Sequence, residues 1–238
     1  MFDLYGMASP NVTKVRLLLE ELAWTYRFHR VRVFRQEQFS PEFLKLNPNG
    51  KVPVLVDHDT ASGAPFKLFE SGAILLYLAE KSGRFLPTAG AERYAVMQWL
   101  MVQLTGVGPL FGQHTHFKFF APPGNDYSLQ RYTREVQRYY RLLDDRLAEV
   151  PYLGGEAYSI ADINLLPWVS LYERQDMDLA SVPNVLRWYR RLNEREAVQR
   201  TFALTAELMA LDAPDVESAS PEHMRSFLNQ AEPAAGSN

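Results

Sequence analysis

The chain has 238 residues, of which 47% are hydrophobic and 22% are charged, with a formal net charge of −3 and no cysteine. These totals are typical of a globular protein with a sizeable core, and they argue against nucleic acid or an anionic membrane as the main partner. The lack of cysteine excludes disulfides, thiolate metal sites and a protein thiol nucleophile. Apolar runs are too short for a membrane span, and no secretory signal pattern opens the chain, so we expect a cytoplasmic protein without a membrane partner.

The first 86 residues alternate between strand and helix signals. Apolar residues at i, i+3, i+4 and i+7 mark one helix face, and alternation with period two marks a strand. A tight connection makes the last two strands antiparallel, and right-handed crossovers then predict a mixed four-stranded sheet with helices on both faces. The expected elements are a strand at 2–5, a helix carrying Val15, Leu18, Leu19 and Leu22, a strand at 28–33, a helix from Pro41, strands at 52–56 and 66–69, and a helix from Ser71 to about Gly83.

The second part of the chain shows helical periodicity and no strand signal. Gly106, Gly108 and Pro109 interrupt the first of its helices, so we expect a kink or break there. The expected helices cover 91–113, 127–150, 159–175 and 183–193, with a last one before Leu211. This organisation predicts an α/β domain over 1–86, a linker over 87–91, an all-helical domain over 92–211 and a mobile, aperiodic tail over 212–238.

Three short stretches admit both a structural and a chemical interpretation. Pro53 fits a strand start, or a cis bond that turns the Val52 backbone toward an extended ligand. Ser71 fits a helix N-cap, but the helix start could also bind a carboxylate while Glu70 binds an ammonium group. The spacing of Ser159 and Asp162 indicates a capping box, which is structural. His114 and His116 diverge on a helix without an acid cluster, so we expect no metal site.

The corner Met7-Ala8-Ser9-Pro10-Asn11 lies where the first strand gives way to a helix. Thioredoxin-like redox proteins carry a Cys-x-x-Cys pair at this corner, whereas this chain offers Ser9 and Asn11. Thiol chemistry here therefore requires a ligand that brings the sulfur. The start of the helix supplies positive dipole and unpaired N–H groups, and both side chains can donate to a thiolate.

Longer stretches resemble the glutathione S-transferase superfamily. PEFLKLNPNGKVPVLVD, FESGAILLYLAEKSGRFLP and YSIADI look like its recurrent signatures. SPNVTKVRLLLEEL, the Gln38-Phe39 pair, QWLMVQLTGVGPLFGQHTHF and YSLQRYTREVQRYYRLLDDRL are similar to its bacterial nu class. The resemblance runs from Phe2 to about Leu211. It implies an N-terminal thioredoxin-like domain, a C-terminal helical bundle and a homodimer.

The resemblance also implies a glutathione site that takes up to two glutathione molecules per subunit. Its implied parts are a cis Pro53 with the Val52 backbone pairing the cysteinyl unit, Glu70 and Ser71 at the γ-glutamyl end, Gln38 and Lys51 near the glycyl end, and Arg131 reaching in from the helical domain of the same subunit or of its partner.

The nu class resembled here reduces disulfides with two glutathiones and conjugates electrophiles only weakly. Ser9 and Asn11 then correspond to the residues next to the sulfur, although the family usually has Thr at the position of Ser9. Tyr5 is the alternative, because many superfamily members activate the thiol with a tyrosine near the end of the first strand. Against Tyr5, strand alternation places it on the same side as Asp3. Ordinary conjugation, dehalogenation and non-catalytic glutathione binding stay open as other functions.

Overall fold

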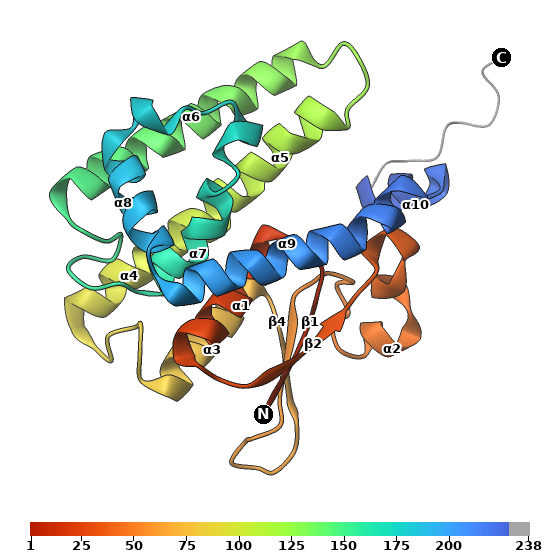
Figure 1. Cartoon of the computed structure of the whole chain (residues 1–238), viewed down its shortest axis with the longest axis horizontal. Helices are drawn as coiled ribbons and strands as arrows, with labels where there is room; N and C mark the ends of the chain where they lie inside the picture. The colour runs from red at the N-terminus through yellow and green to blue at the C-terminus, as the bar shows by residue number, and fades with distance from the viewer. Residues whose placement is uncertain (229–238) are drawn as a thin grey trace.

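The computed structural model describes residues 1–228, which form a sheet domain followed by a helical domain (Figure 1). The elements of the sheet domain are β1 (Phe2–Gly6), α1 (Pro10–Leu22), β2 (Tyr26–Arg30), η1 (Val33–Arg35), η2 (Glu37–Phe39), α2 (Pro41–Leu44), β3 (Val54–Asp57), β4 (Phe66–Phe69) and α3 (Ser71–Ser82). Those of the helical domain are α4 (Gly90–Val102), η3 (Gln103–Val107), α5 (Gly108–Phe119), α6 (Asp126–Glu149), α7 (Ile160–Val169), η4 (Tyr172–Gln175), η5 (Leu179–Ser181), α8 (Pro183–Asn193), α9 (Glu196–Glu217) and α10 (Pro221–Leu228).

The sheet has the predicted four strands in mixed orientation, in the order β2-β1-β3-β4. β1 is parallel to β2 and antiparallel to β3, and β3 is antiparallel to β4. Three strands differ from the prediction in their bounds: β1 extends one residue further, to Gly6, β2 covers Tyr26–Arg30 rather than 28–33, and β3 covers Val54–Asp57 rather than 52–56. β2 ends at Arg30, because the chain turns into η1 at Val33, and β3 begins at Val54, so Pro53 precedes the strand. A proline that cannot donate to the ladder is accommodated at that position.

Helix α1 is the centre of the molecule and is covered on both sides. Ser9 caps it and Pro10 occupies its first position, as expected for a helix start. Leu18 and Leu19 are fully buried against the sheet domain core, while α7 and α9 pack on α1 from the helical domain. Figure 1 shows α9 lying across α1. The double cover explains why the polar residues Thr13, Lys14 and Arg16 are also buried in this helix.

The capping box that opens α7 is confirmed. Asp162 is fully buried and accepts hydrogen bonds from Ser159 N–H and Oγ at 3.1 Å, from Leu153 N–H at 2.9 Å and from Trp188 Nε1 at 2.9 Å. Burial raises the pKa of this carboxyl group and the four donors oppose that rise. The box therefore ties the start of α7 to the preceding loop and to α8.

The expected break near Gly106 is instead a π-helical turn, η3, that joins α4 to α5. The widened turn keeps the helix going past the two glycines and Pro109, and α5 continues to Phe119, beyond the predicted end at 113. Pro109 lacks a backbone N–H to donate to the preceding turn, and the irregular turn directly before it accommodates the proline. Such π-turns inserted in helices often lie at functional sites.

The prediction of an aperiodic tail from residue 212 is wrong for the part that the structure describes. α9 continues to Glu217 and α10 covers Pro221–Leu228. The extension is anchored to the sheet domain: Asp212 accepts from Ala8 N–H at 3.0 Å and from Arg30 Nε at 2.7 Å, and the Phe227 ring lies 4.6 Å from that of Phe34. Residues 229–238 of the predicted tail lie outside the described residues.

Among residues 1–228, no helix combines the length and the apolar character that crossing a membrane requires.

Candidate active site

The corner between β1 and α1 presents hydrogen-bond donors at a helix start. The Ser9 hydroxyl oxygen accepts from Val12 N–H at 3.4 Å, which leaves the hydroxyl hydrogen available for donation. Asn11 is half-buried, and neither its side chain nor its backbone N–H bonds to another described residue. The first turn of α1 carries no acid. The positive end of the helix can therefore stabilise an anion beside Ser9 and Asn11.

Tyr5 packs on the other face of the sheet from α1. Its ring stacks on that of His29 at 4.4 Å, and it packs against the small apolar cluster that contains Val54 and Phe43. Asp3 lies on the same face and bonds to His29, as strand alternation predicted. Burial and the charge of Asp3 raise the pKa of the Tyr5 hydroxyl. Tyr5 and the start of α1 are thus separated by the sheet.

The loop before β3 leaves a backbone segment open for a ligand. The Val52–Pro53 bond is cis, as the family resemblance implied. The Asn47 side chain holds this loop by donating to the Lys51 carbonyl at 2.7 Å and accepting from Asn49 N–H at 2.9 Å. The Val52 backbone itself forms no hydrogen bond with another described residue. An extended peptide can therefore pair with it.

Two loops bring Gln38 and Lys51 to the same region. Gly50 has φ +61°, and a Cβ there would lie 2.8 Å from the Phe39 ring and 3.4 Å from the Gln38 carbonyl. This close approach requires glycine and places the loop before β3 directly against η2. Gln38 is 4% exposed, and its Oε1 has no partner among the described residues, while Lys51 is exposed.

Helix α3 begins in a way that the sequence did not predict. The N-cap is Glu70, with φ 67°, and no side chain caps the helix. Interpretation of Ser71 as the N-cap is therefore wrong, because Ser71 is the first helical residue and is buried. Neither side chain hydrogen-bonds to another described residue. A carboxylate acceptor and a hydroxyl thus stand unused at a helix N-terminus, which suits a ligand bearing both an ammonium and a carboxylate group.

Arg131 is not brought to these residues within one chain. It is exposed on α6 and forms no hydrogen bond or ion pair with a described residue. Glu135, four positions further along α6, accepts from Arg138 Nη2 at 2.8 Å and not from Arg131.

An apolar cavity of about 270 Å³ adjoins Ser9 on the side of the helical domain. The cavity lies between the start of α1, the end of α7 and α9, and its walls include Ser9, Pro10, Thr13, Pro167, Phe202 and Met209.

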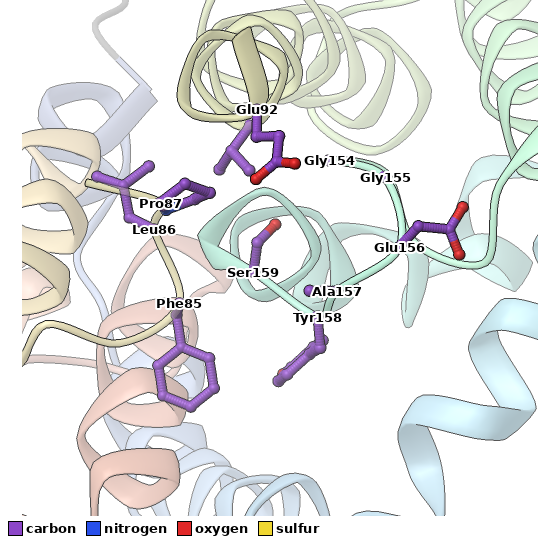
Figure 2. Close-up of a pocket in the computed structure, with 11 residues that line it drawn as sticks. Phe85, Leu86, Pro87, Glu92, Gly154, Gly155, Glu156, Ala157, Tyr158 and Ser159 are labelled. Carbon is purple, nitrogen blue, oxygen red and sulfur yellow. The ribbon is translucent and has the colours of Figure 1, made fainter. Parts of the chain in front are cut away.

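A larger pocket, of about 430 Å³, lies at the domain boundary and is drawn in Figure 2. Its walls are the segments 85–87 and 154–159, with Glu92 and Val96 from α4. None of the site residues predicted from the sequence lines it. Glu92 and Glu156 are the charged side chains in this view, and both are acidic, so the pocket does not suit an anionic ligand (Figure 2).

Two residues near the corner were not anticipated. Lys14, one turn into α1 from Asn11, is fully buried. Asp212, in α9, holds the Ala8 N–H directly before Ser9. The burial of Lys14 could not be predicted because a charged residue usually marks the solvated face of a helix. The contact of Asp212 with the corner could not be predicted because Asp212 lies 204 positions from Ala8 in the sequence.

Comparison with known proteins gives concordant matches over both domains. The model of the glutathione S-transferase N-terminal domain matches residues 1–80, and that of the C-terminal domain matches residues 108–196. The chain is 50% identical over 209 residues to the disulfide-bond oxidoreductase YfcG of Escherichia coli (strain K12), an alignment that covers 87% of this chain and 97% of YfcG.

Solved structures with glutathione bound are similar as well. A glutathione transferase family member from Pseudomonas fluorescens, with two glutathione bound, superimposes with a TM-score of 0.79 at 39% identity, covering 84% of this chain and 91% of that one. A glutathione transferase from Pseudomonas putida, with one glutathione disulfide bound per subunit, gives a TM-score of 0.79 at 40% identity, covering 84% of this chain and 90% of that one.

Proposed function

The chain belongs to the glutathione S-transferase family, and from this membership we propose that it is a glutathione-dependent disulfide-bond reductase. The observation that carries the proposal is the cysteine-free corner at the start of α1, where Ser9 and Asn11 offer donors and the first turn of the helix carries no acid. Fifty per cent identity to a disulfide-bond oxidoreductase supports the reaction class. Relatives with two glutathiones or one glutathione disulfide bound support glutathione as the co-substrate.

The reaction consists of two thiol–disulfide exchanges. A glutathione thiolate attacks one sulfur of the substrate disulfide, the S–S bond breaks, and the departing thiolate takes up a proton. The second glutathione, also as thiolate, attacks the glutathione sulfur of the mixed disulfide and releases the other substrate thiol. Two glutathiones are oxidised to glutathione disulfide, and one disulfide is reduced to two thiols. No cysteine, metal or redox cofactor of the protein takes part in this balance.

The protein contributes binding and ionisation of the first thiol. A free thiol has a pKa near 8.5, and lowering it by one unit requires about 1.4 kcal/mol. The positive dipole at the start of α1 stabilises the thiolate by roughly 0.3–1 kcal/mol. Hydrogen bonds from the Ser9 hydroxyl and the Asn11 amide add about 0.5–1.5 kcal/mol each, which supplies the rest of the required stabilisation. Val52 pairs the cysteinyl backbone, Glu70 and Ser71 hold the γ-glutamyl end, and Gln38 and Lys51 approach the glycyl end.

We further propose that the enzyme is a cytoplasmic homodimer of the nu class. The cytoplasm holds the reducing glutathione pool that the reaction consumes. Exposed apolar side chains on β4 and α4 support a dimer surface: Phe69, Tyr94 and Met101 are 38%, 70% and 39% exposed, and the last two lie seven positions apart on one face of α4. In such a dimer Arg131 reaches the glutathione site of the partner. Sedimentation analysis of the purified protein tests this part.

Conjugation of glutathione to an apolar electrophile is the second candidate activity. The cavity beside Ser9 favours it, because its walls are largely apolar and it opens next to the position assigned to the sulfur. Comparing turnover of a small disulfide with that of a chlorinated aromatic separates the two activities.

The test of the proposal is reduction of a small-molecule disulfide by glutathione, with Ser9→Ala, Asn11→Ala and Tyr5→Phe compared. We expect Asn11→Ala and Ser9→Ala to lower kcat/KM by about tenfold each, corresponding to one hydrogen bond to a charged group. Tyr5→Phe, on the opposite face of the sheet, serves as the control and should stay within about twofold of the wild type. Loss of turnover in Tyr5→Phe alone, with the other two variants fully active, contradicts the site assignment.

A further inference from the structure

Lys14 is a buried cation without an acidic hydrogen-bond partner. Its side chain is 0% exposed, and its Nζ donates one hydrogen bond, to Gln103 Oε1 at 3.2 Å, among the described residues. An ammonium group has three donors, and a buried charge is costly unless it is paired. The acid whose charge acts on it is Glu70, at the start of α3. Fold stability alone therefore gives no reason to keep a lysine here.

Gln103 holds Lys14 from the π-helical turn η3, of which it is the first residue. The Gln103 side chain packs closely on Gly108, because a Cβ at that position would lie 2.8 Å from Gln103 Nε2. The glycine thus leaves room for the amide, and the amide carbonyl is aimed at α1. The irregular turn places a neutral acceptor, rather than a carboxylate, against the buried ammonium group.

The same turn also contacts the start of α3. Leu104, the residue after Gln103, lies against Gly72, where a Cβ would come within 2.4 Å of Leu104 Cδ1. Gly72 directly follows Glu70 and Ser71. Consequently η3 touches α1 through Gln103 and Lys14, and touches α3 through Leu104 and Gly72. It connects the two helix starts assigned to the sulfur and to the γ-glutamyl end of glutathione.

We infer that Lys14, anchored by Gln103, is a positioning residue of the glutathione site that places a buried amino group, protonated while the site holds an anion, between the starts of α1 and α3. The inference rests on the proposed function. In the free protein, burial lowers the pKa of Lys14, and the charge of Glu70 opposes this effect. Bound glutathione adds the γ-glutamyl carboxylate and, once ionised, the thiolate. The two anions raise the pKa of Lys14 above its value of about 7 in the free protein, so the amine is protonated while glutathione is bound. The ammonium group in turn stabilises both anions through the protein interior, where solvent screening is weak.

A titration of enzyme-bound glutathione tests the inference. The ultraviolet absorbance of the thiolate is followed against pH for the wild type, Lys14→Met and Arg16→Met. Arg16 is the matched control, since it is a buried cation in the same helix but lies over the Phe28 ring, 4.1 Å from its centroid. We expect Lys14→Met to raise the pH midpoint of thiolate formation by about one unit, a tenfold loss of thiolate at neutral pH. Arg16→Met should titrate like the wild type.

A second variant, Gln103→Leu, keeps the charge but removes its anchor. A higher pH midpoint of thiolate formation in Gln103→Leu supports the inference, and this readout is available even when Lys14→Met folds poorly. If Lys14→Met and Gln103→Leu both titrate like the wild type, the inference is wrong while the proposed function stands. If the wild type itself takes up no glutathione, the proposed function fails instead.

Discussion

Replacing Lys14 by methionine should change the free energy of unfolding in a way that reverses with pH. Methionine has a similar length and no charge, so it fills the same space. Burial lowers the pKa of Lys14 from 10.5 to about 7, although Glu70 opposes this effect. Each unit corresponds to about 1.4 kcal/mol, so the folded state is destabilised by about 5 kcal/mol at a pH where both states carry the charge.

The sign follows from the protons bound by each state. Below pH 7 both the folded and the unfolded lysine are protonated, so the full cost of burying the charge is present. Between pH 7 and about 10.5 the unfolded state binds more protons than the folded state, and the stability of the wild type therefore rises with pH. The methionine variant lacks this dependence but leaves Gln103 Oε1 without its donor, which costs about 1–3 kcal/mol at every pH.

Lys14→Met should thus be more stable than the wild type by about 2–4 kcal/mol at pH 6. Near pH 10, where about 1 kcal/mol of the burial cost remains because the unfolded lysine is still mostly protonated, the variant should be less stable by up to about 2 kcal/mol. Denaturant unfolding of both proteins at the two pH values measures the difference. Arg16→Met again serves as the control for loss of a buried cation. Equal destabilisation of Lys14→Met at both pH values would contradict this prediction, because it would show that Lys14 contributes to stability by packing and not through its charge.

Four other outcomes follow from the described contacts. Asp162→Ala should lower the free energy of unfolding, measured with denaturant, by about 3–5 kcal/mol, because four buried donors lose their acceptor. Asp178→Ala is the matched control, since the Asp178 side chain accepts one exposed hydrogen bond. Glu70→Gln should raise KM for glutathione about tenfold with kcat nearly unchanged, and an unchanged KM would remove Glu70 from the γ-glutamyl site. Asp212→Ala should cost about 1–2 kcal/mol, because Ala8 N–H loses its acceptor while Arg30 keeps Asp215, and a silent variant would show that α9 does not hold the corner. Tyr94→Glu should shift the sedimentation coefficient to that of a monomer, and a persistent dimer would place the interface elsewhere.

Local signals predicted the parts of the molecule whose causes are local. The spaced apolar residues of α1 specified a helix with an apolar face, and three-residue spacing specified the Ser159–Asp162 box. Both depend on contacts within one or two helical turns. The sheet topology followed as well, because short connections and crossover handedness leave few arrangements.

The mispredicted parts depend on contacts between distant segments. The composition of 212–228 reads as a tail, yet Arg30 and Arg35 bind Asp215 and hold α9 in place. Lys14 is buried only because helices of the second domain cover the polar side of α1. The positive φ of Glu70 could not be anticipated, since glycine is the usual residue for that conformation. Arg131 faces solvent in the single chain, so its assignment still rests on a partner subunit.

The most direct measurement is a crystal structure of this protein with reduced glutathione bound. The account predicts the cysteinyl sulfur within hydrogen-bond reach of the Ser9 hydroxyl or the Asn11 amide, with the cysteinyl backbone paired to Val52 and room for a second tripeptide beside it. A sulfur lying against Tyr5, or crystals that take up no tripeptide at saturating concentration, would contradict it.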